Sequence, residues 1–337
     1  GQTQLLRFLE HASGEHHVAL PPDAPLLPAL QDLGIPVHPV PFRGGLRGFA
    51  RLARVVGRVQ PGLVAAQTAH AHTQALLAAG ARPVVVHRRV DFAVGGNPAS
   101  RAKYAAATGY VAVSDAVGAV LRAGGVPADR IAVVHDGVDP AQAPDPGARA
   151  RVRARFGVPD GHTLVVSLGA LVPHKGHVHL VEALAWIDND RQDVHAVLAG
   201  EGSERAALQA KIAEWGIGSR THLPGPVDAA ELLAAADVFC HPSVEEGMGQ
   251  AVVEAMHAGV PVVASSAGGI PEVVQDMTEG LLVRPGDGAA LSRALVAVVQ
   301  GRERALERAE QARLGARRFS VAAMVQGTLD AYLRFGG

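Results

Sequence analysis

One segment with two apolar runs carries carboxylates and glycines between those runs. The segment Ala236–Ser265 reads ADVFCHPSVEEGMGQAVVEAMHAGVPVVAS, and it contains Glu246 and, eight residues later, Glu254. Gly247 and Gly249 lie between them, at the expected start of a helix. Because glycine has no Cβ, backbone N–H groups there can approach an anion at the positive end of the helix. This pattern predicts a phosphate site, with Glu246 in the loop and Glu254 about one and a half turns into the helix.

Lys175 is a second candidate for binding an anion. It is one of three lysines in the chain and lies in the motif Pro173-His174-Lys175-Gly176. This motif follows the first expected strand of the C-terminal half, and loops at the carboxyl ends of parallel strands are where such folds bind ligands. A compact ammonium group there can neutralise a departing phosphate. The alternative is a solvated surface lysine, the usual state of lysine in proteins.

Together, these motifs closely resemble the signature of glycosyltransferase family 4, the group 1, retaining enzymes with a GT-B fold. The signature is Glu246-x7-Glu254 with its flanking glycines, followed by Gly259–Ala264 (GVPVVA). Further similar segments are Val166–Gly176, Leu198–Gly202, Gly268–Val273 and Gly280–Gly286, with weaker ones at Val113-Ser114 and Gly137–Asp139. The resemblance covers essentially the whole chain and is strongest over 163–300.

The resemblance implies an enzyme that holds a nucleotide-diphosphate sugar in its C-terminal half and transfers the sugar with retention. Glu246 would hold sugar hydroxyls, Glu254 the ribose, and Lys175 the departing diphosphate. Neither a cofactor nor a metal ion is expected, since Lys175 and the helix N-terminus supply positive charge for the phosphates. The expected donor is a UDP-, GDP- or ADP-sugar, and the expected acceptor is a saccharide or a lipid-linked molecule.

Further donor contacts are expected from the loops that follow the strands. Together with Glu254, the candidates are Gly247, Met248, Gly249, Gln250, His174, Gly1, Gly169, Gly202 and Glu272. Glu272 lies just inside an expected helix start, where a carboxylate also suits the helix dipole without touching a ligand. The chain departs from the family pattern at Ala170, where many relatives have an arginine, and at Asp136, where they have an asparagine. The missing arginine removes one expected phosphate contact.

The N-terminal half is expected to supply a group beside the reacting sugar. In the family this residue, often histidine, belongs to the strand and loop that correspond to Val84–Phe92 (VVVHRRVDF). His87, Arg88 and Arg89 compete for this place, so His87 and Arg89 join the two catalytic candidates above. The structural alternative is that one arginine pairs with Asp91.

Two other patterns in the N-terminal half invite a functional interpretation. His70 and His72 would share one face of a strand, but without a third ligand we expect no metal site. On a helix, a basic stripe is formed by Arg43, Arg47, Arg51, Arg54 and Arg58, at steps of 4, 4, 3 and 4. The stripe suits peripheral contact with an anionic membrane or a lipid-linked acceptor, and its alternative is a solvated helix face.

Short apolar runs alternate with helical patterns, which indicates an α/β architecture with doubly wound parallel sheets. The expected strands are 17–21, 37–41, 63–66, 84–87, 110–113 and 131–134, then 163–167, 195–199, 221–223, 238–241, 260–264 and 280–283. The Pro-, Gly- and Asp-rich segment 136–147 separates two Rossmann-like domains, which in the GT-B fold face a cleft. We predict an acceptor-binding domain over 1–144, a donor-binding domain over 145–319, and a helix at 320–335 that packs back on the first domain.

Composition agrees with a globular chain and limits its partners. Hydrophobic residues make up 48% of the chain and charged residues 19%, which excludes a disordered protein. Residues 1–150 carry 14 basic and 10 acidic side chains, too mild an excess to predict nucleic-acid binding. No apolar run reaches the roughly 18 residues of a membrane span. With Cys240 as the lone cysteine, we expect a cytoplasmic protein, also able to lie at the inner face of the membrane.

Some alternatives stay open at this point. The first expected helix has no strand before it, so we expect an N-terminus that lacks the first strand of its sheet. A nucleotide-sugar epimerase or phosphorylase of the same fold would use similar sites. A protein that binds sugar nucleotides without transferring the sugar is the other alternative, because of Ala170 and the expected lack of a first strand. No glycine fingerprint of an NAD-dependent dehydrogenase follows an early strand.

Overall fold

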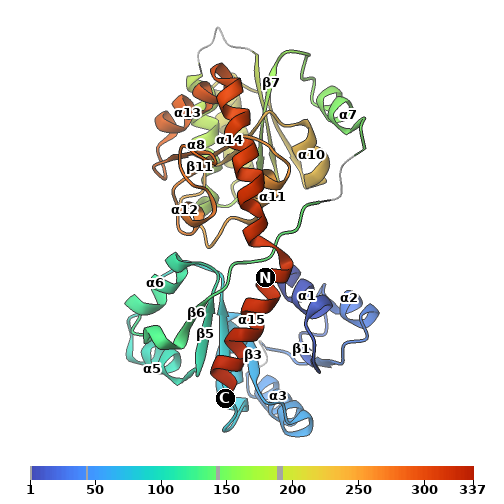
Figure 1. Ribbon diagram of the computed structural model, residues 1–337, viewed down its shortest axis with the longest axis vertical. Coiled ribbons are helices and arrows are strands. Elements are labelled where there is room, and N and C mark those ends of the chain that lie inside the picture. The colour runs from blue at the N-terminus through green and yellow to red at the C-terminus, as the bar shows by residue number, and fades with distance from the viewer. Residues whose placement is uncertain (1, 43–44, 142–144, 188–192) are drawn as a thin grey trace. The chain divides into compact units, whose positions relative to one another are not determined.

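The computed structural model describes residues 2–42, 45–141, 145–187 and 193–337, which form two α/β units (Figure 1). Unit 1 comprises Gly1–Gly137 together with Phe319–Gly337, and unit 2 comprises Val138–Arg318. The chain therefore divides earlier than the predicted 144–145. The C-terminal helix α15 (Val321–Gly336) belongs to unit 1.

Unit 2 contains one sheet of six parallel strands in the order β12-β11-β10-β7-β8-β9. The strands are β7 (Thr163–Leu168), β8 (Val194–Ala199), β9 (Thr221–Gly225), β10 (Val238–His241), β11 (Val262–Ser265) and β12 (Leu281–Val283). Every residue of the four central strands, β7, β8, β10 and β11, is buried. Continuous apolar runs of this kind suit a parallel sheet that is covered on both faces.

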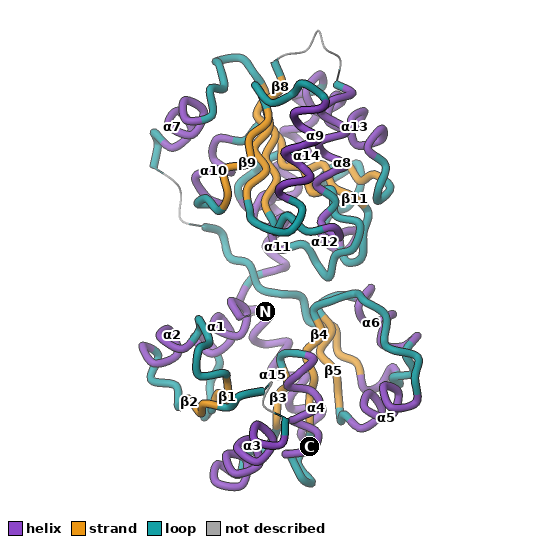
Figure 2. The backbone as a smooth tube through the Cα atoms, turned by 180° about the vertical axis from the view of Figure 1, so that it is seen from behind, coloured by secondary structure: helices purple, strands orange, loops and turns teal. Residues whose placement is uncertain are grey.

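The helices of unit 2 lie on both sides of this sheet (Figure 2). They are α7 (Ala148–Arg155), α8 (His177–Trp186), α9 (Arg205–Glu214), α10 (Ala229–Ala235), α11 (Gln250–His257), α12 (Ile270–Val273), α13 (Gly288–Gln300) and α14 (Arg302–Gly315), with a 3-10 turn at Pro173–Lys175. Leu180 and Leu184 of α8 pack with Leu291 and Leu295 of α13 in the main apolar core. Helix α7 was not predicted from the sequence.

The strand order of unit 2 reverses at β7, because β8 and β9 follow on one side and β10, β11 and β12 on the other. Loops that leave the carboxyl ends of strands on either side of such a reversal diverge, and ligands bind in the resulting crevice. The neighbours here are β7 and β10, so the crevice is expected where the loops after Leu168 and His241 begin.

Unit 1 contains two separate parallel sheets rather than the single sheet that the sequence favours. A two-stranded sheet pairs β1 (Val18–Leu20) with β2 (Val37–Pro39), and a four-stranded sheet has the order β3 (Val64–Ala66), β4 (Val84–Arg88), β5 (Gly109–Ala112) and β6 (Ile131–Val133). No strand among the described residues joins β1 to β3. The expectation that a first strand is missing therefore stays a prediction.

Six helices of the described residues accompany the strands of unit 1 before the chain enters unit 2. They are α1 (Gln2–His11), α2 (Leu27–Asp32), α3 (Leu46–Val59), α4 (Ala69–Ala78), α5 (Pro98–Ala106) and α6 (Asp115–Ala123), the first of which lies against α15. None of the helices in the described ranges combines the length and the apolar character that a membrane crossing requires.

Helix α15 completes the core of unit 1. Its residues Met324 and Val325 pack with Phe8 and Leu30 from the start of the chain. Near its end, Phe335 lies over β5 at Gly109, where a Cβ atom would be only 2.3 Å from the aromatic ring. Glycine at this position therefore allows the ring to pack directly on the strand backbone.

This contact can be tested with a double-mutant cycle. We expect Phe335→Ala to lower the free energy of unfolding by about 3 kcal/mol, because it removes a buried aromatic ring and leaves a cavity. Gly109→Ala should cost about 1–3 kcal/mol through overpacking. In denaturant titrations the double variant should be less destabilised than the sum, since the ring that the new methyl group meets is gone. Leu333→Ala is the control, because Leu333 is 76% exposed on the same helix; additive effects would contradict the direct contact.

Candidate functional site

Two loops meet at the carboxyl ends of β7 and β10 in unit 2. The carbonyl oxygen of His174 accepts hydrogen bonds from the backbone N–H groups of Val244 (2.9 Å) and Glu245 (3.3 Å). Gly176 lies so close to the second loop that a Cβ would be 2.2 Å from the carbonyl oxygen of Pro242, and its φ of 62° also favours glycine. These backbone contacts bring together the loop after β7, which carries Lys175 (the lysine loop), and the loop after β10, which carries Glu246 (the glutamate loop).

Lys175 and Glu246 form an ion pair at the centre of this junction. Lys175 Nζ lies 2.5 Å from Glu246 Oε2. The same oxygen is 2.8 Å from His241 Nε2 and accepts a hydrogen bond of 3.3 Å from Ser243 Oγ. Ser243 Oγ is also 3.0 Å from His241 Nε2. Glu246 Oε2 thus contacts the ammonium group of Lys175, the imidazole of His241 and the hydroxyl group of Ser243.

The environment of Glu246 keeps its carboxyl group ionised. Burial alone would raise the pKa of Glu246, but the hydrogen bond and charge interactions with His241 and Lys175 outweigh it and lower the pKa to about 2. The side chain is only 11% exposed. At neutral pH Glu246 is therefore a hydrogen-bond acceptor and a counter-ion rather than a proton donor.

His177 adds a neutral imidazole to the same cluster. It is the first residue of α8, is buried, and lies near Gly169, from which a Cβ would be 3.8 Å from its Cε1 atom. Burial, followed by the positive potentials of His241 and Lys175, lowers the pKa of His177 to about 3. His177 therefore stays uncharged over the physiological pH range.

Gly249 is the residue immediately before α11. Its φ is 94°, and a Cβ there would be 2.4 Å from Ile270 Cδ1 and 3.7 Å from Glu246 Cγ. The left-handed backbone conformation favours glycine here, and a Cβ would also displace the end of the Ile270 side chain. Gly247 and Met248 before it are buried, whereas Gln250 and Glu254 on the helix are partly exposed.

The neighbouring loops also pack against the two loops of the junction. Glu246 accepts a backbone hydrogen bond of 3.1 Å from Gly269 N–H, which places α12, and with it the partly exposed Glu272, next to the glutamate loop. Gly202 lies against the loop after β7, since its Cβ would be 2.2 Å from the carbonyl oxygen of Leu171. Gly200 approaches Gly169 in the same way, since a Cβ on Gly200 would be 1.9 Å from the carbonyl oxygen of Gly169.

Three residues of this cluster were missed by the sequence interpretation: His177, His241 and Ser243. His241 and Ser243 flank the end of a buried apolar strand, VFCHPS, where a single histidine reads as a core residue. The signal that could have found them is their position, since His241 ends a strand and Ser243 follows it, a few residues before Glu246. His177 comes two residues after Lys175 and carried the same signal.

The catalytic candidates of unit 1 lie at the end of β4. His87 is buried, and its Nε2 is 2.7 Å from the hydroxyl oxygen of Tyr332 in α15. Burial, and next the charge of Arg89, holds the pKa of His87 well below its usual value. Arg89 donates to Asp136 Oδ1 and to Gln67 Oε1, both at 3.0 Å. The side chain of Arg89 is 20% exposed, so it is the more accessible of the two.

The strand assignment for the histidine pair was wrong. His70 and His72 lie in helix α4, where successive side chains point in different directions, so they do not share one face. His72 is buried edge-on against Tyr104 and Tyr110, and burial is the main reason that its pKa is lowered to about 4. Within the described part of the chain, no three His, Cys, Asp or Glu side chains are grouped as metal ligands would be.

The predicted basic stripe lies on α3. Its members Arg47, Arg51, Arg54 and Arg58 are exposed, while Leu52 and Val56 on the opposite side are buried. Arg43 lies outside the described residues, as does Gly1, which had been predicted as a donor contact.

Comparison with known families identifies both halves of the chain. Residues 148–315 match the family described as glycosyl transferases group 1, and residues 3–142 match glycosyltransferase family 4. The chain belongs to the group 1 family 4 glycosyltransferases. The resemblance inferred from the Glu246-x7-Glu254 signature is thereby confirmed.

Individual relatives agree with this assignment. The chain is 35% identical over 199 residues to a 2-deoxystreptamine glucosyltransferase of Streptomyces kanamyceticus, an alignment that covers 57% of the chain and 51% of the relative. It is 37% identical over 163 residues to a GDP-mannose-dependent alpha-(1-6)-phosphatidylinositol monomannoside mannosyltransferase of Mycolicibacterium smegmatis, covering 45% of the chain and 42% of the relative. The chain spans about half the length of the curated relatives it matches.

Solved structures match over nearly the whole chain. The crystal structure of HepE of Anabaena in complex with UDP is 25% identical, has a TM-score of 0.86, and is aligned over 98% of this chain and 94% of its own. A glycosyltransferase from Rickettsia africae is 19% identical and has the same TM-score. It is aligned over 99% of this chain and 93% of its own, and it shares the fold. The predicted GT-B class, with two Rossmann-like α/β units built on parallel sheets, is confirmed by these matches.

The lowered pKa of His177 predicts a pH-dependent stability. Below pH 6.5 the unfolded chain protonates this histidine but the folded chain does not, so the free energy of unfolding should fall as pH decreases toward about 3. His177 contributes up to about 1.4 kcal/mol per pH unit in this range. Denaturant titrations of His177→Gln between pH 6.5 and 4.5 should show a smaller slope than the wild type, whereas the exposed-site control His70→Gln should keep it. An unchanged slope in His177→Gln would show that His177 is not buried in neutral form.

Proposed function

We propose that this chain is a retaining, metal-independent glycosyltransferase that moves a sugar from a nucleotide diphosphate to a saccharide or lipid-linked acceptor. The observation that carries the proposal is the convergence of Lys175, Glu246 and the start of α11 at one edge of the unit 2 sheet. Family membership and the UDP held by HepE support a nucleotide-sugar donor. UDP, GDP and ADP are the candidate nucleotides.

Charge stabilisation is the main chemical contribution of this site. Cleavage of the anomeric bond leaves an oxocarbenium-like sugar and a negatively charged diphosphate. The ammonium group of Lys175 and the N-terminus of α11 after Gly249 would take up that negative charge. Because these two groups supply the positive charge, the proposal includes no metal ion.

Glu246 has two tasks in this proposal. Its ionised carboxylate accepts hydrogen bonds from sugar hydroxyls, and it holds Lys175 in place before the donor arrives. His241 and Ser243 fix the orientation of that carboxylate through its Oε2 atom. With a pKa of about 2, Glu246 does not act as a general acid at neutral pH.

The remaining candidates surround these groups. Glu254, in the second turn of α11, is assigned to the ribose, and backbone groups of the glycine loop to the diphosphate. The loops that carry His174, Gly169 and Gly202 border the same space. In unit 1 we assign Arg89 to the acceptor or the reacting sugar, with His87 holding the strand end through Tyr332.

Two substitutions test the proposal. We expect Lys175→Ala and Glu246→Gln each to lower kcat at least about tenfold, a loss of about 1.4 kcal/mol of transition-state stabilisation. Turnover would be measured from nucleotide release with UDP-, GDP- and ADP-sugars, and the anomeric configuration of the product by NMR. Lys211→Ala is the matched control, since Lys211 lies on α9 over the Trp215 ring.

Near-wild-type turnover in both variants would remove the assigned roles, and an inverted product would refute retention. Ala170 keeps one alternative in view, because that loop position lacks a guanidinium group. A sugar nucleotide that raises the melting temperature of the wild type but yields no product with any acceptor would favour a binding protein instead. Product formed without acceptor would favour an epimerase.

We further propose that the basic face of α3 contacts an anionic surface that presents the lipid-linked acceptor. Its support is the exposure of Arg47, Arg51, Arg54 and Arg58, together with Leu46, which is 84% exposed at the start of the helix. Guanidinium groups and an apolar side chain on one exposed helix are typical of peripheral membrane contact.

Vesicle sedimentation tests this contact. Each arginine near an anionic surface contributes about 1 kcal/mol, so Arg51→Gln/Arg54→Gln should weaken binding to phosphatidylserine-containing vesicles by at least tenfold. Arg304→Gln/Arg308→Gln, on α14, removes the same charge elsewhere and should leave binding unchanged. If the α3 variant binds anionic vesicles as well as the wild type does, the arginines form a solvated helix face. If the wild type binds neutral and anionic vesicles equally, the arginines do not recognise an anionic surface.

A further inference from the structure

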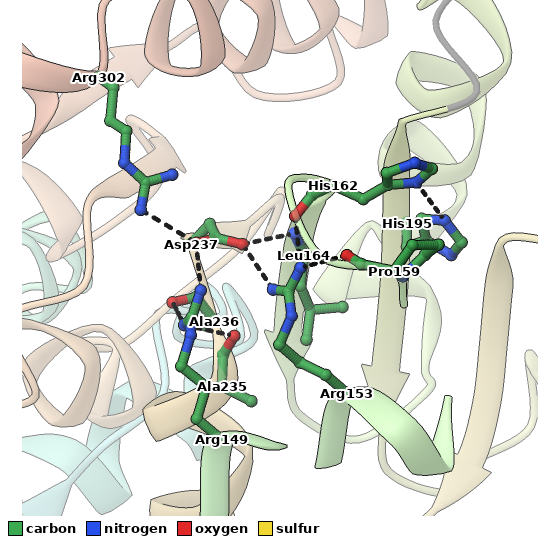
Figure 3. A network of polar contacts seen from close by, with 10 residues as sticks. All are labelled: Arg149, Arg153, Pro159, His162, Leu164, His195, Ala235, Ala236, Asp237 and Arg302. Atoms are coloured by element: carbon green, nitrogen blue, oxygen red, sulfur yellow. Dashed lines mark hydrogen bonds and ion pairs between the residues drawn. The ribbon is translucent and has the colours of Figure 1, made fainter. Parts of the chain in front are cut away.

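A second concentration of charge lies at the other edge of the unit 2 sheet, where β7 and β10 begin (Figure 3). A cavity of about 420 Å³ opens there. Its charged and titratable lining consists of Arg149, Arg153, Asp160, His162, Asp237 and Arg302. The Lys175 loop leaves the carboxyl end of β7, so this cavity is a separate place in the same unit.

Asp237 is already saturated by its neighbours. Its Oδ1 accepts from Arg149 at 2.8 Å, and its Oδ2 accepts from Arg153 and from the backbone N–H of Leu164, both at 2.9 Å. The Asp237 and Arg153 side chains are 6% and 9% exposed. This buried pair connects α7 to the start of the sheet. Two arginines thereby neutralise the negative charge of Asp237.

Arg302 is in a different situation. Its guanidinium group points toward Asp237 in Figure 3, yet its nearest nitrogen is 3.5 Å from an oxygen that Arg149 already occupies. The Arg302 side chain is 68% exposed. A guanidinium group carries five N–H donors, so most of those on Arg302 are available to the cavity. Arg149, at 44% exposure, lies beside it.

The charge balance of the cavity favours an anion. Three arginines face two aspartates, and Asp160 is an exposed loop residue while Asp237 is fully engaged. The positive charge of Arg302 has thus no strong counter-ion in the lining. A planar guanidinium group matches two oxygens of a phosphate, and the volume suits a small ligand rather than a bare ion.

We propose that this cavity is a binding site for a small phosphate-bearing molecule, with Arg302 as its principal donor. Arg149, whose terminal nitrogens already donate to Ala235, Ala236 and Asp237, adds positive charge beside it. Binding there would be distinct from donor binding at Lys175 and does not depend on the proposed transferase activity. Because Arg149 is the second residue of α7 and Arg302 the first of α14, a bound phosphate would link these two helices.

Isothermal titration with inorganic pyrophosphate tests the site. All proteins would carry Lys175→Gln, which weakens anion binding at the proposed donor site. We expect saturable binding in this background and at least a roughly tenfold weaker Kd after Arg302→Gln, as for the loss of a charged hydrogen-bond partner. Arg304→Gln is the matched control, because Arg304 is exposed on the same helix and does not line the cavity; its Kd should stay within about twofold.

Each other result would overturn the proposal. Absence of saturable binding in the Lys175→Gln background would show that the cavity holds no phosphate. An equal loss in Arg304→Gln would show diffuse attraction to the helix rather than a site. Since Arg302 is largely exposed, its variant should keep the wild-type melting temperature, which would be measured alongside.

Discussion

The close approach of two loops, at Gly176 and Pro242, is the constraint on which the candidate site depends. With the carbonyl oxygen of Pro242 2.2 Å from where a Cβ would be, any side chain at position 176 would push the loops apart. Lys175 and Glu246 would then lose their contact. Strand order supplies the rest, because β7 and β10 are neighbours on either side of the reversal in the sheet. The pairing of Lys175 with Glu246 therefore rests on a backbone contact between the loops as well as on the two charges.

The charges at this junction are balanced before any ligand is present. Lys175 is paired with Glu246, and the imidazole of His241 lies against the same carboxylate oxygen. An incoming diphosphate would compete with Glu246 for the ammonium group, which would free the carboxylate for sugar hydroxyls. Partial burial strengthens the attraction of Lys175 to Glu246 and its attraction to a diphosphate, relative to the same pairs in water. The free energy lost when Lys175 leaves Glu246 would therefore be offset by the free energy gained when it pairs with the diphosphate. In the proposed function, donor binding and the orientation of Glu246 would therefore be coupled.

The sequence predicts the frame of the molecule well and its polar interior poorly. Strand positions followed from apolar runs, and the Glu246 and Lys175 loops from their glycines. Helix α7 was missed because its sequence, ARARVRAR, lacks an apolar period and is held by Arg153 and its neighbours. His241 was missed because a single histidine in a buried apolar strand reads as a core residue. The division of the N-terminal strands into two sheets depends on pairing between distant segments, which periodicity does not encode.

The position of α15 has a consequence for the order in which the chain acquires its structure during synthesis. Unit 2 is one uninterrupted segment, whereas the core of unit 1 joins Phe8 and Leu30 to Met324 and Val325. The ribosome makes these last partners only after all of unit 2 has been synthesised. The N-terminal part must therefore wait with exposed apolar surface while the later part folds. Such a nascent chain is a natural client for chaperones that shield unfinished cores.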